Sequence, residues 1–137
     1  MSVLFSPFRL SGATLRNRVV VSPMCQYSAP NGEASAWHVQ HLGQYVVSGP
    51  GLVMIEATAV EAAGRITPLC LGLYTDAQEA ALGRVLDLCR AVGDTPIGIQ
   101  LAHAGRKGAC RVPWQGRGGL GAGGGRVDRL RPLGDRL

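Results

Sequence analysis

Three features that would place the chain outside an ordinary reducing compartment are missing from the sequence. No apolar run approaches the roughly 18 residues that a membrane-spanning helix needs. The first residues lack the basic start and apolar core of a signal peptide. The four cysteines are widely spaced without a C-x-x-C pair, which argues against a zinc site and against a secreted disulfide scaffold. We therefore expect a cytoplasmic protein with reduced thiols, no metal site and no membrane contact.

Basic charge is also scarce over most of the chain, although the net charge is +5. Residues 1–115 contain nine basic and seven acidic residues, whereas residues 116–137 contain five arginines and two aspartates. The basic character therefore comes largely from a short C-terminal segment. That segment is rich in glycine and arginine and has no hydrophobic period, so we expect residues 116–137 to be a disordered tail.

Strand patterns occur five times. Residues 8–10 and 13–15 flank Ser11-Gly12, which is typical of a hairpin turn. Residues 18–22, 52–60 and 96–102 are nearly continuous apolar runs, which predict strands buried on both faces.

Helix patterns separate these strands. Ser35 is a plausible N-cap for a helix over residues 36–48, which Gly49-Pro50-Gly51 ends. Asp76-Ala77-Gln78-Glu79 has the form of a capping box. The second helix carries Arg90 in its last turn and ends at Gly93. Its expected buried face consists of Leu82, Val85, Leu86, Cys89 and Val92.

The order is therefore hairpin, strand, helix, strand, helix, strand. This alternation predicts an α/β fold with a parallel sheet and right-handed crossovers. Three parallel strands and two helices do not close a (β/α)₈ barrel, which needs about 250 residues. The sequence leaves two alternatives open: a small open sheet, or the first part of something larger.

In a parallel sheet the C-terminal ends of the strands share one rim, where such enzymes place their chemistry. The three strand ends carry residues 22–27, residues 56–58 and residues 100–106. Small residues, backbone amides, one long amide side chain and a thiol suit a flat ring with polar edges better than a metal or a phosphate.

These residues resemble a known family, the FMN-dependent NAD(P)H:flavin oxidoreductases called old yellow enzymes. The resemblance covers about residues 3–115, and its motifs occur in the family's order. They are Leu15-Arg16-Asn17-Arg18, Ser22-Pro23-Met24-Cys25-Gln26-Tyr27, and residues 54–60, 64–67 and 98–107. Cys25 and Tyr27 are similar to those of the bacterial subgroup with a cysteine beside the flavin.

The resemblance implies the N-terminal part, residues 1–115, of an FMN-binding TIM barrel. It implies that NAD(P)H reduces the flavin, which then passes hydride to an activated alkene such as an α,β-unsaturated carbonyl. Full-length relatives are expected to be homo-oligomers. The implied flavin contacts are Ser22, Pro23, Met24, Cys25, Ala57 and Gln100. Cys25 would tune the flavin potential, and Tyr27 would border the substrate pocket.

Some of the family's motifs are absent, among them the carbonyl-binding His-x-x-His or His-x-x-Asn pair, the proton-donating tyrosine and the phosphate loops. We therefore expect an incomplete barrel that is itself inactive. We hypothesise that the tail is out-of-frame translation, because GC-rich codons can be chosen for residues 126–137 that, read two bases later, encode Gly-Trp followed by Pro-Ser-Ala-Ile. An intact gene frame ending at Leu137, with no barrel sequence downstream, would contradict this hypothesis.

Other residues have two interpretations each. His38 and His41 have metal-ligand spacing, but packing or capping roles are favoured because no third ligand accompanies them. His103 suits either acid–base chemistry or loop structure, with loop structure favoured, and Glu56 is expected to be a barrel-interior residue with a partner. Cys70, Cys89 and Cys110 are expected to have no special role. The alternative function is a non-enzymatic protein whose basic tail binds RNA or another polyanion, disfavoured because the tail has no interleaved aromatic residues.

Overall fold

The structure, a computed structural model, describes residues 2–116 and residue 119. Its strands and helices follow the predicted order. They are β1 (Phe8–Leu10), β2 (Ala13–Leu15), β3 (Val20–Val21), α1 (Ala36–Ser48), β4 (Leu52–Ala59), α2 (Asp76–Val92) and β5 (Ile97–Ala102). Most of the tail expected over residues 116–137 lies outside the described residues.

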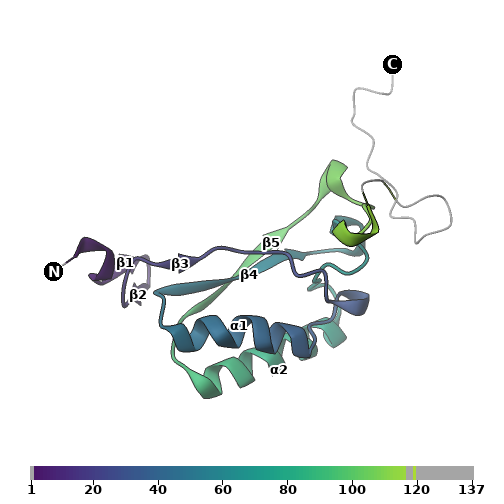
Figure 1. The fold of residues 1–137 in the computed structure, drawn as a ribbon. Helices are drawn as coiled ribbons and strands as arrows, with labels where there is room; N and C mark the ends of the chain where they lie inside the picture. The colour runs from purple at the N-terminus through teal and green to yellow at the C-terminus, as the bar shows by residue number, and fades with distance from the viewer. Residues whose placement is uncertain (1, 117–118, 120–137) are drawn as a thin grey trace.

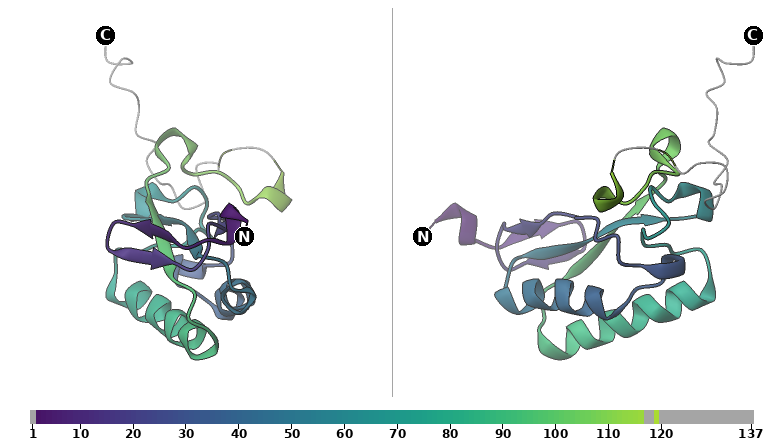
Figure 2. Two further views of the ribbon diagram at one scale, coloured as in Figure 1. Left: turned by 90° about the vertical axis from the view of Figure 1, so that its left-hand side faces the viewer. Right: turned by 45° about the vertical axis from the view of Figure 1, so that its right-hand side comes forward.

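Two separate sheets form, as the sequence predicts (Figure 1). Strands β1 and β2 make an antiparallel hairpin in which Leu10 pairs with Ala13 across the turn. Strands β3, β4 and β5 make a parallel sheet in that order. The two views of Figure 2 show α1 and α2 side by side against one face of this sheet, with the hairpin at one end.

The main core lies between the parallel sheet and the two helices. Val53 and Ile55 of β4 project into it, and Ile97 and Ile99 of β5 pack at its border. The helices contribute Leu42, Val46, Leu82, Val85 and Cys89. Because these β4 and β5 residues face the helices, the alternate residues of each strand lie on the opposite face.

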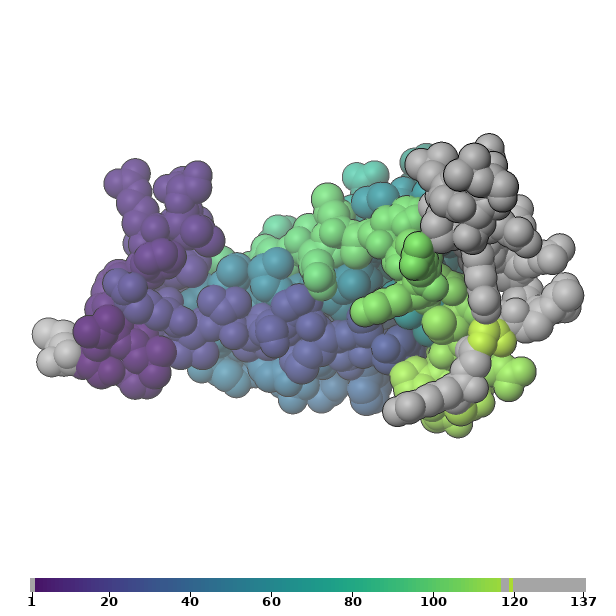
Figure 3. Space-filling model, turned by 90° about the horizontal axis from the view of Figure 1, so that it is seen from above, coloured from purple at the N-terminus to yellow at the C-terminus, as the bar shows by residue number. Residues whose placement is uncertain are grey.

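The opposite sheet face is open, which corrects the prediction that all three strands are buried on both faces. Figure 3 views the molecule from above, the side of the sheet opposite α1 and α2 in Figure 1. On this face Val20 is 48% exposed, and Gln100 of β5 is exposed as well. Leu101 lies on the same face as Ile97 and Ile99 and is 58% exposed because β5 is at the edge of the sheet. Within residues 2–116, β3 and β5 are also edge strands, because each pairs only with β4.

Helix α1 begins and ends at the predicted residues. Ser35 is its N-cap, and the Ser35 amide donates to His38 Nδ1 over 2.9 Å. Gly49 ends the helix with φ +73°, a left-handed conformation that glycine adopts at little cost. The capping interpretation of His38 is confirmed.

Helix α2 corrects two predictions. Its N-cap is Thr75, not Asp76, because the Thr75 hydroxyl accepts a hydrogen bond from the Gln78 amide. Val92 is 59% exposed because it lies in the last turn, beyond the core. Gly93 does end the helix, but in an extended conformation, and a Cβ there would lie 2.7 Å from Val46 Cγ1.

Asn17 joins the hairpin to the sheet. Its side chain donates to the Gly49 carbonyl over 2.9 Å and accepts from the Val19 amide over 3.0 Å. Gly51 packs against it so closely that a Cβ would overlap the Asn17 carbonyl oxygen. This explains why the segment before β3 needs an asparagine and the segment before β4 a glycine.

Candidate functional site

A β-bulge in β4 sets the geometry of the rim. Ile55 pairs with Ile99, but the next pair is Ala57 with Gln100, so Glu56 is an extra residue on β4. A bulge of this kind re-aims side chains, because each one-residue shift exchanges the two faces of a strand. Glu56 therefore points toward α1, and Ala57 lies on the open face.

Beyond the bulge the open face is lined mainly by small side chains. Ala57 pairs with Gln100, and Ala59 pairs with Ala102. Ala57, Ala59 and Ala102 also border a cavity of about 340 Å³ that extends to Cys70 and Ile66. Gln100 is exposed, and its amide has no hydrogen-bond partner among the described residues. The result is a shallow ledge with one free amide at its edge.

The loop after β3 brings the thiol to this ledge. Cys25 is half-buried and lies near the Ala57 backbone, which acts on the pKa of its thiol. Burial raises the pKa of the Cys25 thiol above its ordinary value of 9.0, and the Glu56 carboxylate and Cys70 raise it further. The backbone groups of Ala57 and of Cys25 itself act in the opposite direction, but they offset only part of this increase in the thiol pKa. At neutral pH the group is therefore a protonated thiol, not a thiolate.

Tyr27 lies beside the thiol in a constrained conformation. Its φ is +51°, a left-handed value that is uncommon for a residue with a bulky side chain. Its ring stands edge-on to Trp114, with 6.1 Å between the ring centroids. Burial raises the pKa of the Tyr27 phenol, and the nearby Cys25 thiol adds to that effect.

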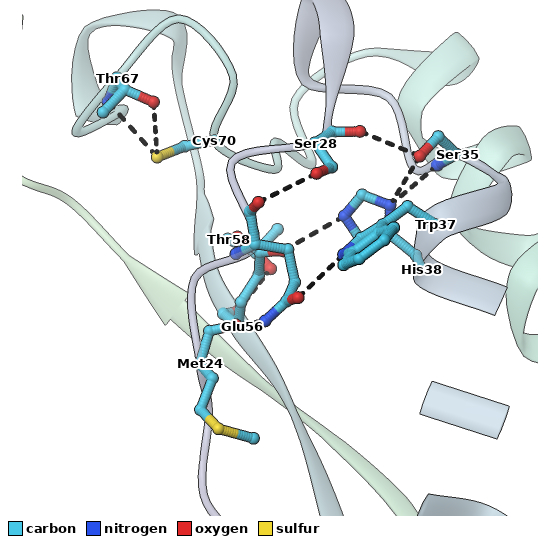
Figure 4. Close-up of polar contacts among 10 residues, drawn as sticks. Met24, Ser28, Ser35, Trp37, His38, Glu56, Thr58, Thr67 and Cys70 are labelled. Carbon is cyan, nitrogen blue, oxygen red and sulfur yellow. Dashed lines mark hydrogen bonds and ion pairs between the residues drawn. The ribbon is translucent and has the colours of Figure 1, made fainter. Parts of the chain in front are cut away.

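A buried polar cluster supports the loop from beneath (Figure 4). Glu56 Oε2 accepts a hydrogen bond from the backbone N–H of Gln26 over 3.1 Å. Glu56 Oε1 lies 3.2 Å from His38 Nε2, and both side chains are only 2% exposed. The Trp37 indole donates to Gln26 Oε1 over 2.9 Å. Glu56 therefore has the expected partner, in His38 and the loop backbone, but the prediction that it lies in the barrel interior is wrong, because the bulge turns it to the helix side of β4.

The other candidates have structural contacts. His103 Nε2 lies 2.8 Å from Glu61 Oε1, and its Nδ1 accepts from the Gly105 amide, which favours loop structure. His41 packs its ring edge-on against Tyr45. Cys70 accepts from the Thr67 amide, as Figure 4 shows, and Cys89 is buried in the core. Over the residues described, no group of three or more His, Cys, Asp or Glu could hold a metal ion, and no helix is long and apolar enough to cross a membrane.

The structure thus brings together the predicted residues of all three strand ends. Ser22, Pro23 and Met24 lead from β3 to Cys25, which adjoins Ala57, which pairs with Gln100. Sequence reasoning missed Trp37 and the bulge. A glutamate inside an otherwise apolar strand is the one signal that could have indicated the bulge.

The ledge fits the edge of a flat, polar-rimmed ring system. Alanines leave room for close approach, Gln100 offers an amide donor and acceptor, and Cys25 offers a weak S–H donor. Concave sites of this kind, apolar with few fixed polar groups, are typical of cofactor binding. Arg65, His103 and Lys107 line the same cavity, so basic side chains also border it.

Comparison with known proteins matches the same region. The sequence model of the NADH:flavin oxidoreductase / NADH oxidase family matches residues 3–115. An NADH:flavin oxidoreductase of Gibberella zeae is 48% identical over 111 residues, 81% of this chain and 27% of its own. An NADPH dehydrogenase of Listeria monocytogenes is 50% identical over 109 residues, 78% of this chain and 32% of its own.

Solved structures agree with this assignment. Morphinone reductase in complex with tetrahydroNAD is 31% identical with a TM-score of 0.72, over 80% of this chain and 29% of that one. The old yellow enzyme homologue from Zymomonas mobilis is 27% identical with a TM-score of 0.68, over 77% of this chain and 29% of that one. The chain therefore spans about a third or less of the length of these relatives.

Proposed function

Because this chain belongs to the NADH:flavin oxidoreductase / NADH oxidase family, the old yellow enzymes, we propose that its rim is one wall of an FMN site. The observation that carries the proposal is the alignment of Cys25, Ala57 and Gln100 along one ledge of small residues. The fold corresponds to part of the relatives' TIM barrel, and the ledge lies at the C-terminal ends of its strands.

Each predicted residue has a role in this proposal. Ser22, Pro23, Met24 and Cys25 contact the isoalloxazine ring as they lead out of β3. Ala57 contacts the flavin edge, where a larger side chain would keep the ring away. Gln100 hydrogen-bonds the pyrimidine part, which presents both donors and acceptors to an amide.

When bound, FMN supplies hydride chemistry, taking electrons from NAD(P)H and delivering them to an activated alkene such as an α,β-unsaturated carbonyl. The chain's own residues orient and tune that group. Cys25 is a neutral S–H at neutral pH, because its thiol pKa is raised, and so adjusts the flavin potential as a weak dipole and not as a negative charge. Tyr27 borders the space where a small enone substrate lies.

We expect little or no turnover from the chain alone. The described residues supply one wall of the site, and the carbonyl-binding and proton-donating groups that the resemblance implies are not among them. We also infer a cytoplasmic location, because all four cysteines are free thiols. Assembly into homo-oligomers is carried over from the resemblance.

Equilibrium dialysis of the purified chain against FMN, with a flavin absorbance readout, tests the proposal. Gln100→Ala should weaken FMN binding by roughly three- to tenfold, the effect of losing one net hydrogen bond. Gln40→Ala, on the exposed side of α1, is the matched control and should leave binding unchanged. Absence of FMN uptake by the unaltered chain, or equal loss in both variants, would contradict the proposal.

A further inference from the structure

The loop between β3 and α1 has no regular secondary structure over residues 22–29, yet it carries the proposed flavin contacts. An irregular loop keeps one conformation only if its backbone groups are held by fixed partners. The partners here come from three places: the β4 bulge, the first turn of α1, and the loop itself.

The bulge contributes the deepest contact. Glu56 is 3% exposed, and its Oε2 accepts the Gln26 amide proton, while Oε1 faces His38 Nε2. Gln26 lies between Cys25 and Tyr27 in sequence. A carboxylate that holds the backbone N–H of Gln26 therefore also restrains the backbone of Cys25 and Tyr27, its two neighbours in the chain.

The tautomer of His38 follows from its other neighbour. The Ser35 backbone amide, which can only donate, lies 2.9 Å from His38 Nδ1. Nδ1 must therefore accept, so the ring proton of the neutral imidazole is on Nε2 and is donated to Glu56 Oε1. Both Glu56 oxygens are then hydrogen-bonded acceptors, and the pair has no unsatisfied polar atom.

A second set of contacts holds Gln26 from the other side. Its side-chain amide donates to the Met24 carbonyl over 2.7 Å and accepts from the Trp37 indole over 2.9 Å. The Ser28 hydroxyl donates to the Gln26 carbonyl, and the Ser35 hydroxyl donates to the Ser28 carbonyl. Figure 4 shows how these bonds join the loop to the start of α1.

The same bulge also turns Ala57 toward the ledge. One structural feature therefore places the flavin-edge residue on one face and the loop's anchor on the other. We propose that Glu56 and His38 are positioning residues. They hold the backbone N–H of Gln26, so that Cys25 stays against Ala57 at the edge of the cofactor. The functional part of this inference rests on the proposed FMN site.

Labelling of thiols with a maleimide, read by peptide mass spectrometry, tests the anchor without any flavin. Glu56→Gln puts an NH₂ group against the His38 N–H or the Gln26 N–H, so one hydrogen bond is lost. After division by the thiolate fraction of Cys25 at the labelling pH, its rate should be about tenfold faster, as expected for loss of a charge-assisted hydrogen bond, while core Cys89 stays protected. Glu61→Gln alters the exposed His103 pair and is the matched control; it should change neither rate.

A second readout separates positioning from general destabilisation. With FMN bound, the midpoint potential of the flavin should shift in Glu56→Gln and not in Glu61→Gln. If the unaltered chain takes up no FMN, the proposed function fails, but the labelling result still decides whether Glu56 anchors the loop. An unchanged Cys25 rate in folded Glu56→Gln would overturn the inference.

Trp37→Phe keeps the inference falsifiable if Glu56→Gln does not fold. The Trp37 side chain is 52% exposed, so the change removes one hydrogen bond with little loss of core packing. Cys25 labelling should rise several-fold, by the same argument. An unchanged rate in Trp37→Phe, with Glu56→Gln unfolded, would also overturn the inference.

Discussion

At the scale of single residues, Cys25 is defined by its surroundings more than by its own chemistry. Burial raises the pKa of its thiol above 9.0, and the Glu56 carboxylate acts in the same direction. The thiolate fraction at neutral pH is therefore smaller than that of a free cysteine. A thiol in this state suits a tuning role beside a cofactor better than a nucleophilic one.

The pH profile of Cys25 alkylation should show this directly. Iodoacetamide reacts with the thiolate, so the rate should rise toward a plateau with an inflection above pH 9.0. Glu56→Gln removes a charge that raises the pKa, so its inflection should move to lower pH. An inflection below that of a free cysteine in the unaltered chain would contradict the account.

The residues of the candidate site divide clearly into those that sequence could and could not indicate. Ser22 to Tyr27 stand at a strand end and form one continuous motif, so pattern and resemblance both identify them. The partners of Glu56 depend on a one-residue bulge, which no apolar periodicity encodes. Trp37 likewise becomes important only because the loop folds back over α1.

At the scale of elements, boundaries are predictable where local chemistry sets them. Ser35 and Gly49-Pro50-Gly51 fix α1 at its predicted ends. The start of α2 is one residue off, because both Thr75 and Asp76 are capable caps and the tertiary fold selects Thr75. The role of Gly93 in close packing is invisible to sequence, because Val46 meets it from a different helix.

Gly93→Ala should therefore destabilise the protein by about 1–3 kcal/mol, the usual cost of overpacking. A Cβ there would meet Val46 Cγ1 at 2.7 Å and the Val46 carbonyl oxygen at 3.2 Å. Gly83→Ala, inside α2 with open space around it, is the control and should stabilise by about 0.5–1 kcal/mol. Urea unfolding measures both, and equal effects of the two changes would refute the packing argument.

At the scale of the whole molecule, sequence predicts topology well and burial poorly. The hairpin and the parallel order of β3, β4 and β5 follow from alternation and strand length. Burial depends on which elements pack against a strand. The apolar sequences of β3 and β5 do not indicate how many strands or helices pack against each of them. Val20 and Leu101 are consequently far more exposed than expected for residues inside continuous apolar runs.

The open strand edges and sheet face should make the isolated chain self-associate. Light scattering after size-exclusion chromatography should show mass that increases with protein concentration. Leu101→Lys, on the β5 edge, should reduce association, whereas Val47→Lys, on exposed α1 surface, should not. A monomeric chain with one cooperative thermal transition would contradict this expectation.

The claim that these strand ends form one wall of a flavin site is tested most directly by NMR titration of the labelled chain with FMN. The account predicts saturable shifts of the amides of Cys25, Ala57 and Gln100, with the β1–β2 hairpin unchanged. Shifts confined to other residues, or none with FMN raised to about 1 mM, the limit of weak binding, would contradict it.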